Sequence, residues 1–404
     1  MSILFISAGS IANNPRLYKE VFLAHSQGMK VGCVCCDYDG WSASIEKQRY
    51  KELSEVNFSV AHFSRNYFLH WLTAAAAQGF CRKIRRFFPE RIWINSVADD
   101  RRSLAVFLAL PKERYDLVVA HSLAAFPAAL SYAARHRIPC GFDVEDFHPG
   151  EGMLPDSEYG RVRAKLLQAL LPHTAYFTYA SPLIGEEVKR LLSQERLPRS
   201  EYIRNCFSRE FFPYREPAFG GPIRLVWFSQ TIGPGRGLEP LLSSTAKFSG
   251  GFEVTLIGAG QEAFCADLIA RYGDFLRILP PLPEERLYPE LCNHDIGLAL
   301  EVSLSDFNRK ICLTNKIFAY LQAGLFILAT ETPAQRDFLA GHPDCGILCN
   351  VDEAAIVAGL KFLLDNMDEI RRKKRFRHEA SSAFCMEEEN RKLLAVWKAV
   401  ERIS

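Results

Sequence analysis

Short apolar runs alternate with amphipathic stretches along the chain, and this alternation predicts strands that alternate with helices. In the first half, Gly28 ends the first helical stretch, so that a strand, a helix and a second strand form a βαβ unit. The elements predicted there are strands at 2–8, 30–36, 115–120 and 138–142 and helices at 16–27 and 124–135. The first half is therefore predicted to be a doubly wound α/β domain.

The alternation breaks between 204 and 222, where aromatic, Pro and Gly residues are concentrated as in an interdomain connection, and then restarts. The elements predicted after the break are strands at 223–229, 252–257, 275–279, 295–300 and 325–329 and helices at 237–248, 261–272, 284–292 and 315–323. This is a second Rossmann-like domain. The chain after Asp352 is helical by pattern, and we expect its last helix, at 386–402, to return to the first domain.

The predicted organisation is therefore an N-terminal domain at 1–215, a C-terminal domain at 216–385 and a returning segment at 386–404. A length of 404 residues suits two domains. With 49 Lys and Arg against 47 Asp and Glu, the charge balance does not favour a nucleic-acid partner.

Met1 to Ala8 enter a strand directly, without the basic flank and cleavage site of a secretory signal, so we expect a cytoplasmic protein. No apolar run approaches the ~20 residues of a membrane span, which leaves peripheral contact with the inner face of the cell membrane open. Among the twelve cysteines, Cys33, Cys35 and Cys36 lie close together. No second Cys/His pair with zinc spacing accompanies them, so buried thiols are favoured over a metal cluster.

Ligands of open parallel sheets bind at the carboxyl ends of strands, so the loops that follow strands are the candidate sites. The loop after the first strand contains Gly9, Asn13 and Asn14 and leads into a helix that begins near Arg16. Its free helix N–H groups could bind an acceptor. A plain turn between strand and helix is the alternative.

His121 directly follows a predicted strand, where it could face a cleft and hydrogen-bond a sugar hydroxyl, or remain a core histidine. A second loop, after the strand at 138–142, contains Asp143, Glu145, Asp146 and His148. Clustered carboxylates repel one another unless a ligand or a cation compensates them, which favours a functional loop.

The second domain offers a site for a diphosphate. A glycine-rich loop allows close backbone approach, and a helix N-terminus with a lysine can hold negative charge. Two cations would stabilise a leaving diphosphate. The residues concerned are Gly233, Gly235, Arg236 and Gly237 in the loop, and Thr314 as a candidate N-cap with Asn315 and Lys316 at the helix start.

Taken together, these motifs resemble the large family 4 of retaining glycosyltransferases, which have the GT-B fold of two facing Rossmann-like domains. The likeness covers nearly the whole chain. Its strongest part is the block at 295–324, which resembles the family's donor site, and the loop at 233–237 resembles its phosphate-binding loop. The strand that ends at His121 resembles one whose histidine contacts the donor sugar in that family.

The sequence also departs from the family. Ala319 stands where a glutamate commonly binds the ribose, Ile311 replaces the partner acid, and Thr231 replaces a basic residue of the first loop. Either Glu301 or Asp306 could supply the ribose contact, and we favour Glu301.

The resemblance implies front-face substitution with retention, from a nucleotide-sugar donor and without a further cofactor. His121, Asp143, Glu145, Arg236 and Lys316 are the candidate catalytic residues. No metal is expected. An acidic motif at 37–39 resembles the metal motif of the other major glycosyltransferase fold, but it follows the second strand of a different architecture.

The acceptor is expected to be a glycan or a lipid-linked saccharide, as in the synthesis of cell-surface polysaccharide. The stretch at 79–94 interleaves basic and aromatic residues and could lie on an anionic membrane, or it could be an ordinary helix packed on the first domain.

Three other functions compete with this hypothesis. A GT-B subunit without catalysis is favoured by Ala319, and a sugar-nucleotide epimerase would share the fold. An NAD-dependent oxidoreductase would use the glycines at 258–260, but no acid follows the next strand to bind a ribose.

Overall fold

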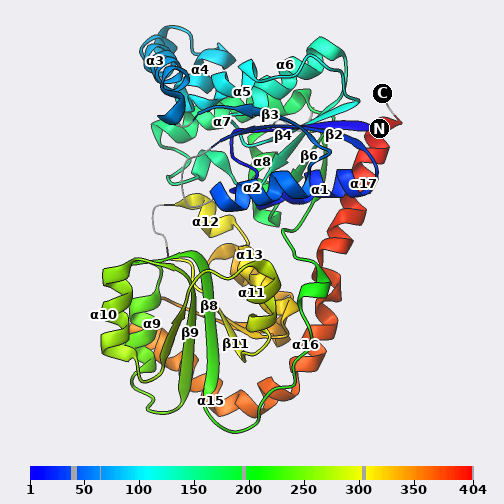
Figure 1. Ribbon diagram of the computed structural model, residues 1–404. Coiled ribbons are helices and arrows are strands. Elements are labelled where there is room, and N and C mark those ends of the chain that lie inside the picture. Colours follow the sequence, from blue (N-terminus) through cyan, green and yellow to red (C-terminus); the bar gives the residue numbers. More distant parts are fainter. Residues whose placement is uncertain (38–42, 64, 193–196, 303–305, 403–404) are drawn as a thin grey trace. The chain divides into compact units, whose positions relative to one another are not determined.

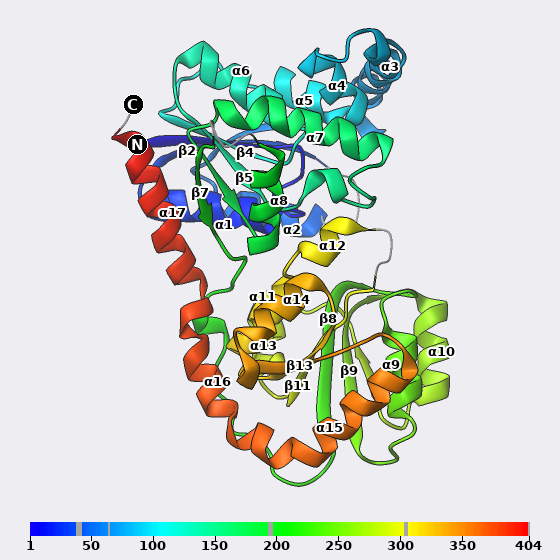
Figure 2. The ribbon, with the colours of Figure 1, turned by 180° about the vertical axis from the view of Figure 1, so that it is seen from behind.

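The computed structural model describes residues 1–37, 43–63, 65–192, 197–302 and 306–402 (Figures 1 and 2). The chain divides into two compact units. Unit 1 runs to Ile203 and also includes a short segment that ends at Asn308 and the residues from Asn390 onward. Unit 2 comprises the remainder, from Arg204 to Glu389.

Unit 1 is built on a parallel seven-stranded sheet in the order β3-β2-β1-β4-β5-β6-β7. Its strands are β1 (Ser2–Ser7), β2 (Lys30–Cys36), β3 (Asn57–Ala61), β4 (Leu117–His121), β5 (Cys140–Val144), β6 (Tyr176–Tyr179) and β7 (Arg199–Tyr202). The central strands are apolar on both faces because helices cover both sides of the sheet.

The helices of unit 1 lie in layers on the two faces of this sheet. They are α1 (Pro15–Ser26), α2 (Ala43–Glu52), α3 (Phe68–Ile84), α4 (Ile92–Asp99), α5 (Arg102–Leu108), α6 (Phe126–His136), α7 (Glu158–Leu170), α8 (Pro182–Leu191) and most of α17 (Met386–Glu401). Figures 1 and 2 show α1 and α17 on one face and α5 and α6 on the other. Helix α3 packs on α4 and α5, and α5 packs on β2 and β3, so α3 belongs to an outer layer.

The end of the chain completes the core of unit 1. Trp397 of α17 is fully buried beside Phe5 of β1, with ring centroids 6.0 Å apart. Its indole Nε1 donates a hydrogen bond to the hydroxyl of Tyr176, at 3.0 Å. The last helix therefore contributes an apolar face and a buried hydrogen bond to the first sheet.

Unit 2 has a parallel six-stranded sheet in the order β10-β9-β8-β11-β12-β13. Its strands are β8 (Ile223–Ile232), β9 (Phe252–Gly260), β10 (Leu276–Leu279), β11 (Ile296–Ala299), β12 (Phe326–Thr330) and β13 (Gly346–Cys349). Its helices are α9 (Leu238–Thr245), α10 (Glu262–Tyr272), α11 (Glu284–Leu291), α13 (Asn315–Gln322), α14 (Pro333–Ala340), α15 (Glu353–Arg372) and α16 (Lys374–Ala380). Helix α12 (Phe307–Ile311) begins in unit 1 and ends in unit 2.

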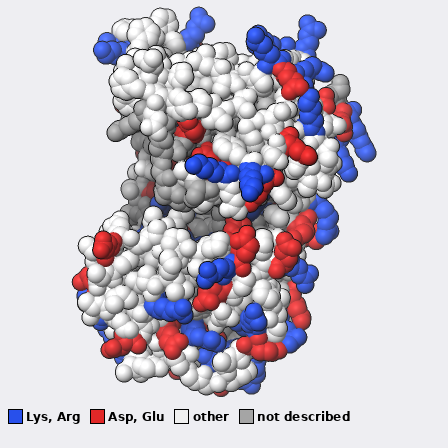
Figure 3. Space-filling model, viewed as in Figure 1, with Lys and Arg blue, Asp and Glu red and all other residues white. Residues whose placement is uncertain are grey.

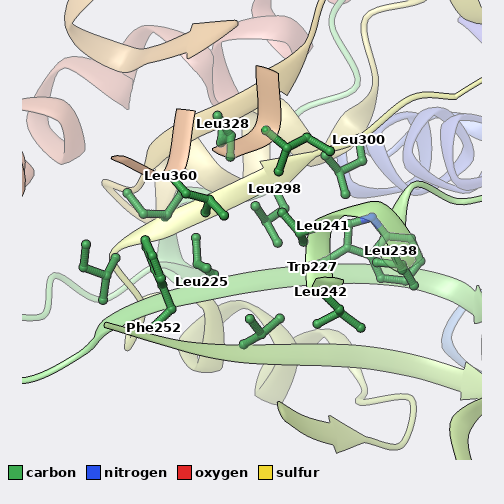
Figure 4. Close-up of a cluster of buried hydrophobic side chains, with 14 of the residues drawn as sticks. Leu225, Trp227, Leu238, Leu241, Leu242, Phe252, Leu298, Leu300, Leu328 and Leu360 are labelled. Carbon is green, nitrogen blue, oxygen red and sulfur yellow. The ribbon is translucent and has the colours of Figure 1, made fainter. Parts of the chain in front are cut away.

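The core of unit 2 lies between the sheet and α9 and α15. Figure 4 shows Leu225 and Trp227 of β8 with Leu298 of β11 and the leucines of α9, and Leu360 of α15 closes the cluster. Two Rossmann-like α/β units are therefore present.

The division between the units comes earlier than the sequence pattern placed it, at Ile203 instead of residue 215. Phe207 and Phe212 explain the difference, since their rings pack on Tyr288 of α11 with centroids 4.6 Å and 4.9 Å away. Residues 204–215 thus belong to unit 2, with Phe207 and Phe212 in its core. At the other end, 386–389 also belong to unit 2, and the return to unit 1 begins at Asn390.

The basic and aromatic stretch at 79–94 is not one helix. Helix α3 ends at Ile84, a 3-10 turn η2 (Arg85–Phe87) follows, and α4 begins at Ile92, after Pro89. Gly258 and Gly260 lie within β9, and Gly260 pairs with Ile232 of β8, whereas a dinucleotide-binding turn would place these glycines between a strand and a helix. Among the described residues, no helix is both long enough and apolar enough to span a membrane.

Candidate functional site

Each unit has one point at which its sheet switches the side on which strands are added. In unit 1 the chain adds β2 and β3 on one side of β1 and then β4 on the other, and in unit 2 it adds β9 and β10 on one side of β8 and then β11 on the other. The loops after the two central strands diverge at such a point and leave room for a ligand. The candidate residues are therefore those at the carboxyl ends of β1, β4, β8 and β11.

In unit 1, four polar residues form a row across the sheet. Ser7, His121, Asp143 and Thr178 are paired in register on β1, β4, β5 and β6. Residues paired in register point to the same face of a sheet. His121, Asp143 and Thr178 thus meet α1, whose buried side presents Arg16 and, one turn later, Glu20.

These side chains form a buried ion cluster, which we call the unit 1 cluster: Arg16, Glu20, His121, Asp143 and Thr178. Arg16 donates from Nε to Asp143 at 2.8 Å and from a terminal nitrogen to its other oxygen at 2.5 Å, and its remaining nitrogen donates to the Ile203 carbonyl at 2.8 Å. The Thr178 hydroxyl donates to Asp143 at 2.6 Å. The His121 ring lies between the two acids, with Nε2 3.4 Å from Glu20 and Nδ1 3.5 Å from Asp143.

Burial and charge oppose each other in this cluster. Burial alone would lower the pKa of His121, but the carboxylates of Glu20 and Asp143 raise it to about 10. Burial alone would raise the pKa of Asp143, but Arg16 and His121 lower it well below its usual range. The cluster therefore holds two cations and two anions, a balance that buried charges require.

Glu20, His121 and Asp143 are also the described residues whose ligand atoms are close enough to hold a metal ion, all within 4.8 Å of one another. Asp143, however, already accepts three hydrogen bonds, two of them from Arg16. A divalent ion would have to displace or face that guanidinium. The donor set therefore suits an internal ion cluster better than a metal.

This geometry changes the interpretation of three predicted site residues. We expected Arg16 to bind an acceptor, and His121 and Asp143 to face a ligand. Instead, the exposed fraction of each side chain is 3% or less, and each faces an oppositely charged side chain. What they do is hold the carboxyl ends of β4, β5 and β6 against α1.

The acidic loop after β5 is partly available to a ligand. Glu145 is half-buried, and burial first, then the neighbouring Asp146, raises its pKa to about 7. Asp146 accepts a hydrogen bond from the side-chain amide of Asn308, at 2.6 Å, and Asn308 also accepts from the Phe147 N–H. His148 pairs through Nδ1 with Glu151 at 3.1 Å. The loop is thus held in shape, with Glu145 as its least constrained carboxyl group.

The loop after β1 places its predicted residues in different roles. Asn14 caps α1, its side-chain oxygen accepting from the Leu17 N–H at 2.9 Å. The Asn13 side chain is exposed, and the Gly9 carbonyl accepts from the Cys36 N–H. Next to them Ser122, directly after β4, has a left-handed φ of 80°, a strained conformation of the kind that functional loops retain.

In unit 2, the loop from Gly233 to Gly237 joins β8 to α9. Gly235 and Gly237 have φ of 74° and 78°, and a Cβ at Gly237 would lie 3.0 Å from the side chain of Val302. The loops after β8 and β11 are therefore in contact. Arg236 is half-buried and donates to the Thr231 hydroxyl at 3.2 Å.

At the same edge, Lys316 and Glu301 form an ion pair with Nζ and Oε1 3.4 Å apart, and Lys316 also lies 5.7 Å from the centre of the Trp227 ring. Thr314 precedes α13, but its side chain does not cap the helix. Among the described residues, the enclosed Thr314 hydroxyl and Trp227 indole N–H have no hydrogen-bond partner. Buried polar atoms are usually paired, so a ligand is a natural partner for them.

Asn315 begins α13 and is half-buried, and the first N–H groups of a helix have no partner within it. Ala319, one turn further, is fully enclosed among apolar side chains. A carboxylate at that position would have no room to reach a ribose without rearrangement. Glu301 is the nearest predicted replacement, because it already contacts Lys316 at the helix start.

Sequence reasoning missed four residues of these sites: Glu20, Thr178, Trp227 and Asn308. Glu20 could have been found, because an acid at the spacing of Arg16, Leu17 and Ala24 falls on the buried face of the helix. Thr178 follows Tyr176 at strand spacing and so shares its face. Nothing in the pattern marks Trp227 or Asn308.

No protein-family model and no curated protein sequence matches this chain. Solved structures do match. Sucrose-phosphate synthase of Thermosynechococcus elongatus aligns with a TM-score of 0.70 at 12% identity over 100% of both chains. Anabaena HepE in complex with UDP-glucose aligns with a TM-score of 0.65 at 14% identity, over 99% of this chain and 100% of that one.

A glycosyltransferase of Rickettsia africae aligns with a TM-score of 0.64 at 12% identity, over 100% of this chain and 98% of that one. These alignments run across both units. The chain therefore has the two-domain α/β architecture of the GT-B fold.

Proposed function

We propose that this protein is a retaining glycosyltransferase that takes a sugar from a nucleotide-sugar bound at the switch point of unit 2. The observation that carries the proposal is the start of α13. There, Lys316 and an enclosed Thr314 hydroxyl without a partner among the described residues adjoin the helix N-terminus. Anabaena HepE, whose structure is similar, is bound to UDP-glucose.

The chemistry of this edge suits a diphosphate. The free N–H groups of α13 and the Lys316 ammonium offer positive charge, and the Thr314 hydroxyl offers a further donor. Arg236 on the neighbouring loop supplies a second cation. Negative charge grows on the β-phosphate as the glycosidic bond breaks, so these groups stabilise the transition state more than the bound donor.

Glu301 is our proposed ribose ligand. Its carboxylate can accept hydrogen bonds from a diol, and its contact with Lys316 places it beside the diphosphate. It would take the role that a glutamate at position 319 has in the family that the sequence resembles.

Transfer with retention then needs positioning rather than a strong protein base. The acceptor hydroxyl forms a bond to the anomeric carbon while the bond from that carbon to the β-phosphate oxygen breaks. The proton of the hydroxyl passes to the departing oxygen. Because Lys316 and Arg236 carry the positive charge, we propose that no metal takes part.

On the acceptor side we propose the loops of unit 1, with Asn13, Glu145 and the Asp146–His148 segment as contacts for a glycan or a lipid-linked saccharide. The product would belong to a cell-surface polysaccharide, made in the cytoplasm or at the inner face of the membrane. The unit 1 cluster serves this function indirectly, by holding the strand ends that carry these loops.

Ala319 supports a second candidate, a GT-B subunit that binds a glycan or a partner without catalysis. A sugar-nucleotide epimerase is a third. Slow hydrolysis of the donor in water would exclude the subunit, and release of an epimerised nucleotide-sugar without any acceptor would favour the epimerase.

A thermal-shift screen with UDP-, GDP-, ADP- and TDP-sugars tests the proposal. A donor at 100 times its dissociation constant should add ~2.7 kcal/mol to the free energy of unfolding. Lys316→Ala should remove that shift, whereas Lys361→Ala, at an exposed lysine of α15, should keep it. If no nucleotide-sugar raises the melting temperature of the wild type, a non-catalytic GT-B subunit becomes the better account.

A further inference from the structure

Helix α3 turns its large apolar side chains outward. The exposed fractions are 74% for Leu69 and 64% for Phe80, and Phe87 of η2 is 66% exposed. Leu69, Leu72, Ala76 and Phe80 are separated by three or four positions, so they lie along one side of the helix. Soluble proteins seldom expose a continuous apolar stripe of this kind without a partner for it.

The less exposed side of the same helix combines Trp71 and Ile84 with small and polar residues. Ala74 is its buried residue. Gln78 donates from its side chain to the Ala98 and Asp99 carbonyls, at 3.4 Å and 3.2 Å, and Arg82 donates to the Ala98 carbonyl at 3.0 Å. Helix α3 is thus held in part by hydrogen bonds to the end of α4. A surface helix usually turns its large apolar side chains towards the core, whereas α3 exposes several of them.

The charged residues of α3 and η2 themselves are all basic. The sequence contains no Asp or Glu between Glu55 and Glu90. Lys83 and Arg86 are exposed, and the Arg86 guanidinium lies 4.7 Å from the centre of the Phe87 ring. Arg85 is paired with Glu158, whereas the exposed Arg82 donates to the neutral Ala98 carbonyl. Arg82, Lys83 and Arg86 therefore carry the positive charge at the surface. Figure 3 shows Lys and Arg side chains beside the uncoloured surface over α3, at the upper left.

We propose that the outward face of α3 and η2, which we call the α3 face, docks on a bilayer that contains anionic lipid. The phenyl and leucyl side chains would enter the boundary between headgroups and acyl chains, and Lys83 and Arg86 would meet the lipid phosphates. The helix would lie in the plane of the membrane surface.

The same charge argues against a second copy of this chain as the partner. A symmetric contact through the α3 face would enclose Lys83 and Arg86 of both copies between two surfaces, with no acid on α3 or η2 to compensate them. An anionic surface is the complementary partner.

A second exposed aromatic offers a matched comparison. Phe376 of α16 also has basic neighbours, but the two adjacent exposed ones are already paired with acids: Lys373 with Asp344 and Glu369, and Arg375 with Glu216. A phenyl group with neutralised neighbours should attract an anionic membrane much less.

Flotation of the full-length protein with vesicles tests the proposal and needs no donor, so its outcome is independent of the proposed function. The wild type should float with vesicles of phosphatidylcholine mixed with phosphatidylglycerol and remain unbound with pure phosphatidylcholine. The double variant Phe80→Ser/Phe87→Ser should weaken binding by at least ~10-fold. Lys83→Ala and Arg86→Ala should each weaken it roughly five-fold. Phe376→Ser should bind as the wild type does.

Thermal melting should confirm that the serine variants remain folded, because the replaced side chains are exposed. The proposal fails if the wild type binds no anionic vesicle, or if Phe376→Ser reduces binding as much as the α3 variant. It also fails if the wild type is a dimer that Phe80→Ser/Phe87→Ser separates into monomers, since the α3 face would then be an interface between copies.

Discussion

The switch points of the two sheets have similar topology but differ in how their polar side chains are paired. At the end of β4, oppositely charged side chains of unit 1 face one another, with Asp143 accepting from Arg16 and Thr178 and His121 lying between Asp143 and Glu20. At the end of β11, unit 2 presents Lys316 with one acidic neighbour, beside a hydroxyl and an indole N–H that have no partner among the described residues. A charged residue at a strand end is therefore not enough to identify a ligand site.

What separates the two places is how the charged groups are held. In unit 1 each buried cation and anion lies within 3.5 Å of an opposite charge, and Asp143 accepts two hydrogen bonds from Arg16, which makes the burial of these charges tolerable. In unit 2, Lys316 adjoins a helix N-terminus and an enclosed Thr314 hydroxyl that has no partner among the described residues, a cost in the free protein that a ligand can relieve. We therefore propose that the unit 1 cluster supports the strand ends and that the donor binds at the start of α13.

The largest expected effect comes from breaking the unit 1 cluster. Asp143→Ala leaves Arg16 and His121 buried without their shared carboxylate, and should lower the free energy of unfolding by ~3–5 kcal/mol. Urea unfolding measures this. Asp156→Ala, at an exposed aspartate of the same unit, should change it little. A small loss in Asp143→Ala would mean that the cluster is not the support we describe.

The protonation of His121 should appear in the pH dependence of stability. Its pKa is raised from 6.5 to about 10 on folding, so its stabilising effect is complete below pH 6.5 and disappears as the pH rises towards 10. The wild type should lose up to ~1.4 kcal/mol per pH unit in this window relative to His121→Gln. If the difference in the free energy of unfolding between the two proteins were the same at pH 7 and pH 8, a protonated His121 would be contradicted.

Smaller effects are expected at Thr314, where one substitution should raise the stability of the free protein and lower its affinity for the donor. Thr314→Val removes an enclosed hydroxyl that has no partner among the described residues and should stabilise the free protein by ~1 kcal/mol. The same change should weaken donor binding about 10-fold, because the hydroxyl is then missing from the diphosphate site. Calorimetric titration and thermal melting give the two readouts. If Thr314→Val were less stable than the wild type and bound the donor equally well, Thr314 would not be part of the donor site.

The smallest expected effect is that of removing metal ions on the donor-induced thermal shift. If Lys316 and Arg236 neutralise the diphosphate, EDTA should leave the donor-induced thermal shift unchanged. A shift that EDTA abolishes and Mg²⁺ or Mn²⁺ restores would require a metal in donor binding.

Much of this architecture follows from the sequence, since β1, β4 and β12 are continuous apolar runs and α13 begins where the pattern predicted. The sequence pattern passed over β6 and β7, which are short and partly polar. It also placed the domain boundary too late, because only the packing of Phe207 and Phe212 on Tyr288 assigns them to unit 2.

The sites were harder to predict for a physical reason. A sequence shows that His121 and Asp143 end neighbouring strands, but not that Arg16 and Glu20 occupy the space where a ligand would bind. The acidic motif at 37–39 has its second and third residues outside the described residues, and its first, Asp37, accepts from the Phe63 N–H and pairs with His62. The outward direction of α3 likewise depends on its contacts with α4.

Hydrogen exchange in the presence of the nucleotide-sugar that gives the largest thermal shift tests the central claim most directly. The account predicts that binding slows exchange of the amides in the loop at 233–237 and at the start of α13, near 314–317, with exchange in β4 and β5 unchanged. Protection confined to the loops after β1 and β4, with none at the start of α13, would contradict it and return the donor site to unit 1.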